Sequence, residues 1–163
     1  MVVSRTNKLM VVLRLVMAGI MLWAFFDKLI GLGFSTPPDK SWLAGGSPTL
    51  GYLKFATQGP LSTIFQSIAG NFFIDWLFML GLLGVGLSML LGIGMKIGSY
   101  SGALIIGLIW LSAFPPKNNP FLDEHIVYLL IFLNFAHSNV GDQWGFGEKW
   151  KSLGLVKKYP FLI

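Results

Sequence analysis

A short polar stretch between two apolar runs holds the residues whose types best suit chemistry. It contains two adjacent carboxylates, Asp123 and Glu124, followed by His125, one of only two histidines in the chain. A histidine titrates near neutral pH, and a nearby carboxylate can assist it in proton transfer. We therefore predict these three residues as a catalytic group that relays protons. Two of them have simpler roles open to them, because aspartate is a common helix N-cap and glutamate suits the positive end of a helix.

Basic and aromatic residues occur in segments expected at the same end of the molecule. Lysines near a helix N-terminus favour a small anion, and we predict that a substrate of this kind is bound by Lys28, Lys40, Lys54 and Asp75. Aromatic rings at that depth can receive a flat ring arriving from the lipid, and we assign this role to Trp42, Trp76 and Trp110. Snorkelling or pairing of the lysines, and a plain aromatic belt, are the alternatives.

The histidines and the absence of cysteine argue against a metal or haem site. His137 is expected on the same helix as His125, roughly 18 Å further along and roughly 120° around the axis. Two histidines so placed do not bind one metal, and the chain has no cysteine to complete a site. We predict no metal and no haem, and we interpret His137 as an ordinary interfacial histidine.

The elements that must position these residues are membrane helices. Of 163 residues, 54% are hydrophobic and 12% are charged, whereas a soluble domain carries about 25% charged residues. The apolar runs are continuous, which favours helices over alternating strands, and each approaches the roughly 20 residues that cross a bilayer. We predict an all-α fold class, a polytopic membrane protein with spans at about 9–29, 72–95, 97–116 and 122–140.

The connection between the first two spans is unusually long, and long loops tend to be functional or disordered. Its aromatic content and turn residues predict an ordered helical cap on the outer face, at about 35–70, with short helices at 49–56 and 61–69. Residues 141–163 are expected as an interfacial tail of the single domain 1–163. The whole is predicted as a four-transmembrane-helix bundle with this cap between helices 1 and 2.

The distribution of basic residues predicts the orientation. With the N-terminus inside, eight of the twelve lysines and arginines lie on the inner side, namely Arg5, Lys8, Arg14, Lys96, Lys149, Lys151, Lys157 and Lys158. We therefore predict a multi-pass protein of the plasma membrane with both termini cytoplasmic. The first helix is expected to be retained, because Arg14 interrupts its apolar run and no cleavage site follows. The net charge of +5 is accounted for in this way, so we predict no nucleic-acid partner.

Small residues recur every four positions in two of the spans. Gly94, Gly98 and Gly102 form one row, and Gly84, Ser88 and Gly92 form the other. Such rows let helix backbones approach closely. Their simplest role is packing within the chain, and they also predict a homo- or hetero-oligomer in membrane lipid.

Several segments carry a family resemblance. They are Gly33-Phe34-Ser35-Thr36-Pro37, Ser41-Trp42-Leu43, Gly45-Gly46-Ser47-Pro48-Thr49, Asp75-Trp76-Leu77-Phe78-Met79 with Gly81-Leu82, and Pro115 through Tyr128. Together they resemble the DoxX/DoxD-like family, and more specifically the membrane (large) subunits of thiosulfate:quinone oxidoreductase. Matching positions are Arg14, Lys28, Trp42, Asp75, Trp76, Asp123 and His125.

The resemblance implies a four-helix membrane bundle that oxidises two thiosulfates to tetrathionate and passes two electrons to a membrane quinone. It also implies a small partner subunit, which nothing in this chain resembles. A non-catalytic subunit that anchors or assembles a redox partner is therefore the alternative. A carrier of small anions or lipid solutes is a third reading, disfavoured by the small number of spans and the lack of an inverted repeat.

Overall fold

The computed structural model describes residues 8–117 and 119–163, and this part of the chain is helical without strands. Arg5, counted above among the inner basic residues, lies outside the described residues, as does the N-terminus itself. The α-helices are α1 (Lys8–Phe26), α2 (Leu50–Phe55), α3 (Ser62–Ser67), α4 (Phe72–Leu91), α5 (Met95–Ser112), α6 (Glu124–Ala136), α7 (Gly147–Ser152) and α8 (Gly154–Lys158). Short turns of other helix types are η1 (Asp27–Gly31), η2 (Pro38–Lys40), η3 (Val140–Asp142) and η4 (Pro160–Leu162).

Three helices are long and apolar enough to cross a membrane. They are the continuous helix Lys8–Gly31 of 24 residues, α4 of 20 residues and α5 of 18 residues. Glycines with positive φ at Gly92 and Gly94 end α4 and start α5, so the turn occupies residues 92–94, a few residues before the boundary predicted near 96. α5 ends at Ser112 and not at 116, because Pro115 and Pro116 follow and proline disfavours a helical residue before it.

The fourth predicted span is shorter than expected. α6 has 13 residues, which is roughly 20 Å of helix and less than the roughly 30 Å of the hydrocarbon layer. Asp123 fixes its start, because the carboxylate accepts from the backbone N–H of His125. At the other end the chain leaves the helix at His137 and turns into η3. The run 122–140 therefore contains a helix with extended or turning residues at both ends.

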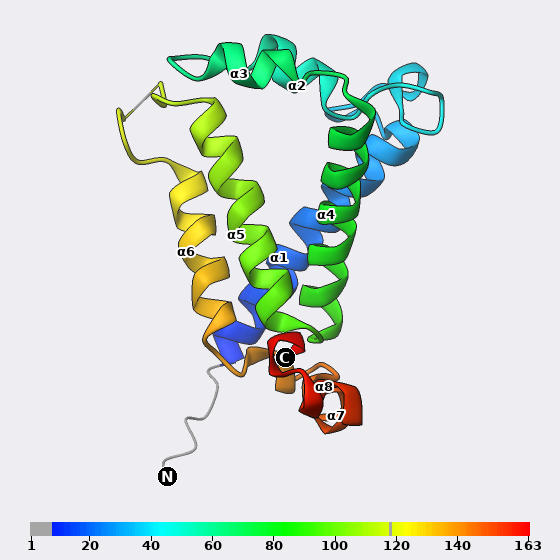
Figure 1. The fold of residues 1–163 in the computed structure, drawn as a ribbon, viewed down its shortest axis with the longest axis vertical. Coiled ribbons are helices and arrows are strands. Elements are labelled where there is room, and N and C mark those ends of the chain that lie inside the picture. Colours follow the sequence, from blue (N-terminus) through cyan, green and yellow to red (C-terminus); the bar gives the residue numbers. More distant parts are fainter. Residues whose placement is uncertain (1–7, 118) are drawn as a thin grey trace.

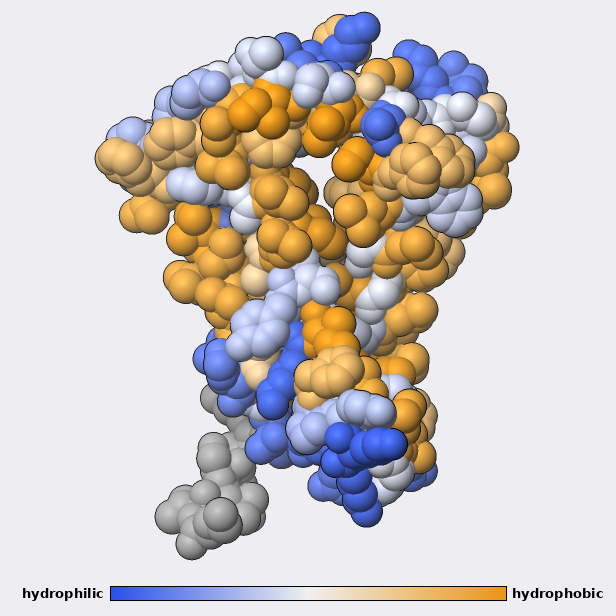
Figure 2. Space-filling view, viewed as in Figure 1, coloured by the Kyte–Doolittle hydropathy of each residue, from blue (hydrophilic) through white to orange (hydrophobic). Residues whose placement is uncertain are grey.

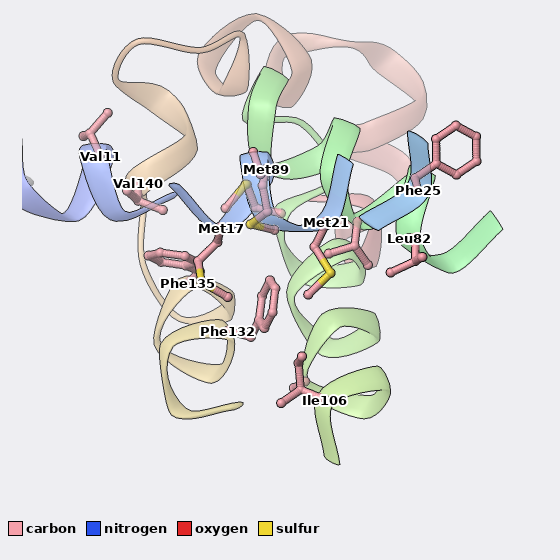
Figure 3. Packing of buried hydrophobic residues seen from close by; sticks show 14 of the residues in the cluster. Val11, Met17, Met21, Phe25, Leu82, Met89, Ile106, Phe132, Phe135 and Val140 are labelled. Carbon is pink, nitrogen blue, oxygen red and sulfur yellow. The ribbon is translucent and has the colours of Figure 1, made fainter. Parts of the chain in front are cut away.

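The core lies where α1 crosses the other long helices. Fifteen buried apolar residues form one cluster, and in Figure 3 Phe132 and Phe135 of α6 lie beside Met17 and Met21 of α1. Figure 1 shows α1 running diagonally from the lower end of α6 toward the upper end of α4, while α4 separates from α5 and α6 toward the end where α2 and α3 lie. The end that carries α2 and α3 is called the strap end below. The opposite end, which carries α7 and α8, is called the tail end.

The glycine rows serve close packing inside the chain. A side chain at Gly98 would overlap Ser88 of α4, and one at Gly102 would overlap Phe132 of α6. Gly84 differs from them, because a Cβ there would meet no atom within 4 Å. The prediction of packing within the chain is therefore confirmed for Gly98 and Gly102, and the prediction of an oligomer stays open at Gly84.

Arg14 joins the long helices to the tail. Its side chain is fully buried, and its guanidinium donates to the carbonyls of Met89 and Leu90 at the end of α4. The same group donates to the carbonyls of Gln143 (3.1 Å) and Trp144 (3.0 Å) before α7. Helix-terminal and loop carbonyls lack partners of their own, so one arginine satisfies two segments that are far apart in the sequence.

The strap, which we define as residues 47–59, connects α4 to α5 at the strap end. The strap contains α2, which corresponds to the short helix predicted at 49–56. The next helix, α3, corresponds to the short helix predicted at 61–69. The hydroxyl of Tyr52 lies 2.9 Å from Ser112 Oγ, and Gln58 donates to the carbonyls of Ala113 and Pro115, both at 3.0 Å. The strap is therefore fastened directly to the end of α5.

Gly59→Ala is expected to loosen this attachment. Gly59 has a φ of +74°, and a Cβ there would overlap the carbonyl oxygen of Phe114. We expect the free energy of unfolding to fall by about 2–3 kcal/mol, from crowding and backbone strain combined. Gly45→Ala is the matched control, because Gly45 has a φ of +88° with nothing within 4 Å of an added Cβ. If the two variants lost the same amount of stability in thermal unfolding, the close contact with Phe114 would not contribute to the effect.

Candidate functional site

The predicted catalytic group forms a hydrogen-bonded pair at the start of α6. Asp123 Oδ1 accepts from the backbone N–H of His125 at 3.0 Å, which confirms the N-cap role. Its other oxygen, Oδ2, lies 3.0 Å from His125 Nδ1. A carboxylate on Nδ1 orients the imidazole and leaves Nε2 to exchange protons. The side chain of His125 is 25% exposed, so it is partly open to its surroundings.

Glu124 is exposed and stands beside the pair. One potential ligand atom from each of Asp123, Glu124 and His125 lies within 4.8 Å of the others. Two carboxylates and an imidazole are a donor set that divalent metals accept. Exposed acidic groups commonly occur without a metal, and the prediction of no metal stays a prediction.

Trp110 on α5 lies at the level of His125. Gly102 faces Phe132 and Gly107 faces Leu129, so α5 and α6 run antiparallel in a register that brings position 110 opposite the first turn of α6. The indole Nε1 of Trp110 is buried and has no hydrogen-bond partner in the described part of the chain. An unpaired buried donor is costly, and a ligand oxygen at this place would remove that cost.

Aromatic rings extend from Trp110 toward the start of α6. The ring of Phe114 lies 5.1 Å from that of Trp110 and 6.2 Å from that of Phe121, centre to centre. Figure 2 shows a hollow between α4 and α5 below the strap, bordered by apolar side chains. The rings of Trp110, Phe114 and Phe121 offer an apolar surface with one unpaired N–H donor, at the level of a histidine that can exchange protons.

The predicted anion-binding residues do not meet this group. Lys28 lies in η1, and its ammonium is 3.3 Å from Ser35 Oγ. Lys40 and Lys54 are exposed, and Lys54 lies 5.7 Å from the ring centre of Phe55. In Figure 1 the end of α1 and the start of α6 lie on opposite sides of the molecule. Lys28 and His125 therefore share the strap end but not one site, whereas Lys54 lies on α2 between the two sides.

Two buried aspartates near these lysines organise loops. Asp27 accepts from the backbone N–H groups of Phe34 (3.2 Å) and Ser35 (3.1 Å) and also from the Ser35 hydroxyl. Asp75 accepts from the hydroxyls of Ser47 and Thr49 and from the backbone N–H of Thr49. The predicted substrate ligand Asp75 thus fastens the strap to α4, at the end opposite to its attachment on α5.

Asp75→Ala is expected to release this end of the strap. The change removes three hydrogen bonds to a carboxylate that is 6% exposed. We expect a loss of about 2–4 kcal/mol in the free energy of unfolding and faster hydrogen exchange in residues 47–59. Asp75→Asn is the control, because the amide keeps one acceptor oxygen. Unchanged exchange in the alanine variant would contradict this structural role.

Two of the predicted ring-binding tryptophans pack against each other. The rings of Trp42 and Trp76 lie 4.7 Å apart in an edge-to-face arrangement, and Phe72 lies 6.0 Å from Trp76. Backbone hydrogen bonds from Trp42 and Leu43 to Lys28 and Leu29 hold this loop on the end of α1. These two tryptophans therefore lie near Lys28 at the end of α1, whereas Trp110 lies at the level of His125 at the start of α6.

Sequence reasoning did not single out two features of the tail end. One is the set of hydrogen bonds by which Arg14 clamps the end of α4 to the segment before α7. The sequence indicates this role only through the position of a single charge inside an apolar run. The other is a cavity bordered by Lys96, His137 and Lys151, which combines segments too distant in the sequence for any local pattern. His137 itself is exposed and lies 3.1 Å from the Tyr100 hydroxyl, as suits an interfacial histidine.

No protein-family model, curated protein or solved structure matches this chain.

Proposed function

We propose that the chain is a membrane oxidoreductase that oxidises thiosulfate, or a related small sulfur anion, and reduces membrane quinone. Two thiosulfates together lose two electrons and join through a new sulfur–sulfur bond to form tetrathionate. One quinone takes up both electrons and two protons to become the quinol. The protein must therefore receive a lipid-soluble ring, bind an anion and deliver protons to the ring oxygens.

The observation that carries the proposal is the unpaired indole N–H of Trp110 at the level of the Asp123–His125 pair. A quinone oxygen would accept a hydrogen bond from this N–H, and the rings of Phe114 and Phe121 would line the apolar side. His125 Nε2 would supply a proton, with Asp123 holding the imidazole in orientation. The apolar hollow below the strap supports entry of the ring from the lipid (Figure 2).

The separation of the lysines from His125 favours a second candidate function. Direct electron transfer from an anion to a quinone requires the two to come close together. Lys28 and the start of α6 lie on opposite sides of the strap end (Figure 1). A membrane subunit that binds quinone and anchors a redox partner needs no anion site of its own, and the small partner subunit would then supply the electrons.

The proposal includes an orientation. We place the protein in the plasma membrane, with the strap end as a cap on the outer face. The tail end with its lysines then lies on the cytoplasmic side, as the distribution of basic residues indicates. α6, with the residues that flank it, would form the fourth span. Association with further copies of the chain, or with a small partner subunit, belongs to the same proposal.

Quinone reduction by the purified full chain tests the proposal. The protein is supplied with thiosulfate and a short-chain quinone, and quinol is followed by absorbance while tetrathionate is measured chemically. We expect one tetrathionate per quinol and no quinol without thiosulfate. A homogeneous chain that is inactive alone and active with a co-purifying subunit would establish the second candidate. Inactivity in both preparations would exclude both functions.

A further inference from the structure

The tail end holds two adjoining cavities that the proposed function does not use. The first, of about 380 Å³, has a mixed lining of glycine, apolar and polar residues, and the polar ones include Lys96, His137, Asn139, Asp142 and Lys151. The second is a groove of about 330 Å³ between α4 and α5, bordered mainly by small and aliphatic residues, among them Gly81, Gly84, Leu87, Ile97 and Ser101. We call them the tail pocket and the helix groove.

The two cavities meet at the same residues. Gly94 and Trp150 border both of them. Gly94 lies in the tight turn that joins the two helices, and the indole N–H of Trp150 donates to the carbonyl of Leu162 at 2.7 Å. Because a glycine has no side chain to separate its two sides, a molecule could extend from the polar cavity into the apolar one. Such a molecule would have a polar head and an apolar chain.

Two lysines and the carboxylate of Asp142 border the tail pocket, and they leave one lysine without a partner. Lys151 lies 2.8 Å from Asp142 Oδ2 and 3.0 Å from Asn139 Oδ1, so its charge is largely matched within the protein. His137 is engaged with the Tyr100 hydroxyl. Lys96 is exposed, its backbone N–H donates to the carbonyl of Ile163, and within the described residues its ammonium has no hydrogen-bond or ion-pair partner. Its ammonium is therefore the cation that remains for a ligand.

We propose that the tail pocket and the helix groove together bind one anionic phospholipid. The phosphate lies in the tail pocket on the side of Lys96, and the upper part of one acyl chain lies in the helix groove along Gly84. A pocket with charged residues that shares Gly94 and Trp150 with an apolar groove on two membrane-length helices argues for a lipid over a soluble anion. This site is independent of the proposed redox function, because it lies at the opposite end of the molecule (Figure 1).

The chain offers a matched pair of variants for the groove. Gly84 and Gly19 both have open space where a Cβ would stand, and both are exposed on membrane-length helices. Gly84→Leu fills the helix groove, whereas Gly19→Leu adds the same side chain on α1 outside it. For the pocket, Lys96→Gln removes the unmatched cation, and Lys157→Gln removes an exposed lysine of the same end that borders neither cavity.

The test is a titration of the delipidated full chain in detergent, with the unfolding temperature as the readout. The probes are phosphatidylglycerol, phosphatidylcholine with the same acyl chains, glycerol phosphate and inorganic phosphate. We expect phosphatidylglycerol to bind most tightly. Lys96→Gln should weaken it about fivefold, as expected for one lysine at a lipid surface, and should leave phosphatidylcholine unchanged. Gly84→Leu should weaken both lipids by about tenfold or more, since an occupied groove excludes the acyl chain.

The control variants are expected to bind both lipids as the unaltered chain does. Equal binding of phosphatidylglycerol and phosphatidylcholine would overturn the assignment of an anionic head group. Binding of glycerol phosphate or inorganic phosphate as tight as that of phosphatidylglycerol, and unaffected by Gly84→Leu, would assign the pocket to a soluble anion and overturn the lipid proposal. If Gly84→Leu weakened lipid binding no more than Gly19→Leu does, the proposal that an acyl chain lies in the helix groove would be overturned.

Discussion

Arg14→Ala is expected to lower the free energy of unfolding by about 3–5 kcal/mol and to detach the tail from the helices. The side chain is fully buried, and its guanidinium serves four carbonyl oxygens, two ending α4 and two in the segment before α7. Alanine leaves these acceptors without their donor and leaves a cavity where the arginine was. Lysine in its place keeps a charge but lacks the planar fork that reaches all four, so we expect it to be nearly as damaging.

Two measurements separate the local effect from a general loss of stability. Thermal unfolding in detergent gives the loss of stability, and limited proteolysis at Lys149 and Lys151 reports release of the tail. Lys8→Ala is the control, because Lys8 is a basic residue on the same helix but is exposed. If Arg14→Ala unfolded at the temperature of the Lys8 variant and its tail stayed resistant to protease, the clamp would have no energetic importance.

His125→Ala is expected to reduce the rate of thiosulfate-dependent quinone reduction by about 10²–10⁴-fold, the usual contribution of a positioned acid–base group. The imidazole is held by Asp123 at 3.0 Å and is partly exposed, so its loss should remove proton delivery without leaving a large cavity. We expect the loss to appear in kcat more than in KM, because the proposed role is proton transfer. Asp123→Asn should have a smaller effect, since the amide preserves the N-cap but does not stabilise the imidazolium form.

The second histidine of the chain provides the control. His137→Ala changes the same residue type just after the end of the same helix, at the tail end, where it contacts Tyr100. We expect this variant to reduce quinone at the normal rate. A His125→Ala protein that is folded, membrane-inserted and fully active would show that the Asp123–His125 pair is only a helix cap. Equal losses in both histidine variants would point to a general defect of α6.

Local sequence patterns predicted most of the helices. Membrane-length apolar runs predict α1, α4 and α5, since an unpaired backbone in lipid leaves few alternatives to a helix. Pro60 and the turn cluster at 45–48 made the short helices α2 and α3 predictable. Asp123 was recognisable as an N-cap because capping depends on neighbours along the chain. The end of the fourth run was mispredicted, since hydropathy does not reveal where an apolar segment leaves the helix.

The sequence by itself determined the helical class, the membrane-length helices α1, α4 and α5, and a polar group of Asp123, Glu124 and His125 before a further helix. It predicted a full fourth span there, where the structure has a helix of 13 residues. These features depend on contacts between near neighbours and on the cost of burying polar backbone. The tertiary structure alone decided that Lys28 and His125 lie on opposite sides of the strap end, and that Asp75 fastens a loop. It also decided that Arg14 clamps the tail. Those outcomes depend on the crossing and divergence of the helices, which arise from side-chain packing between segments far apart in the chain.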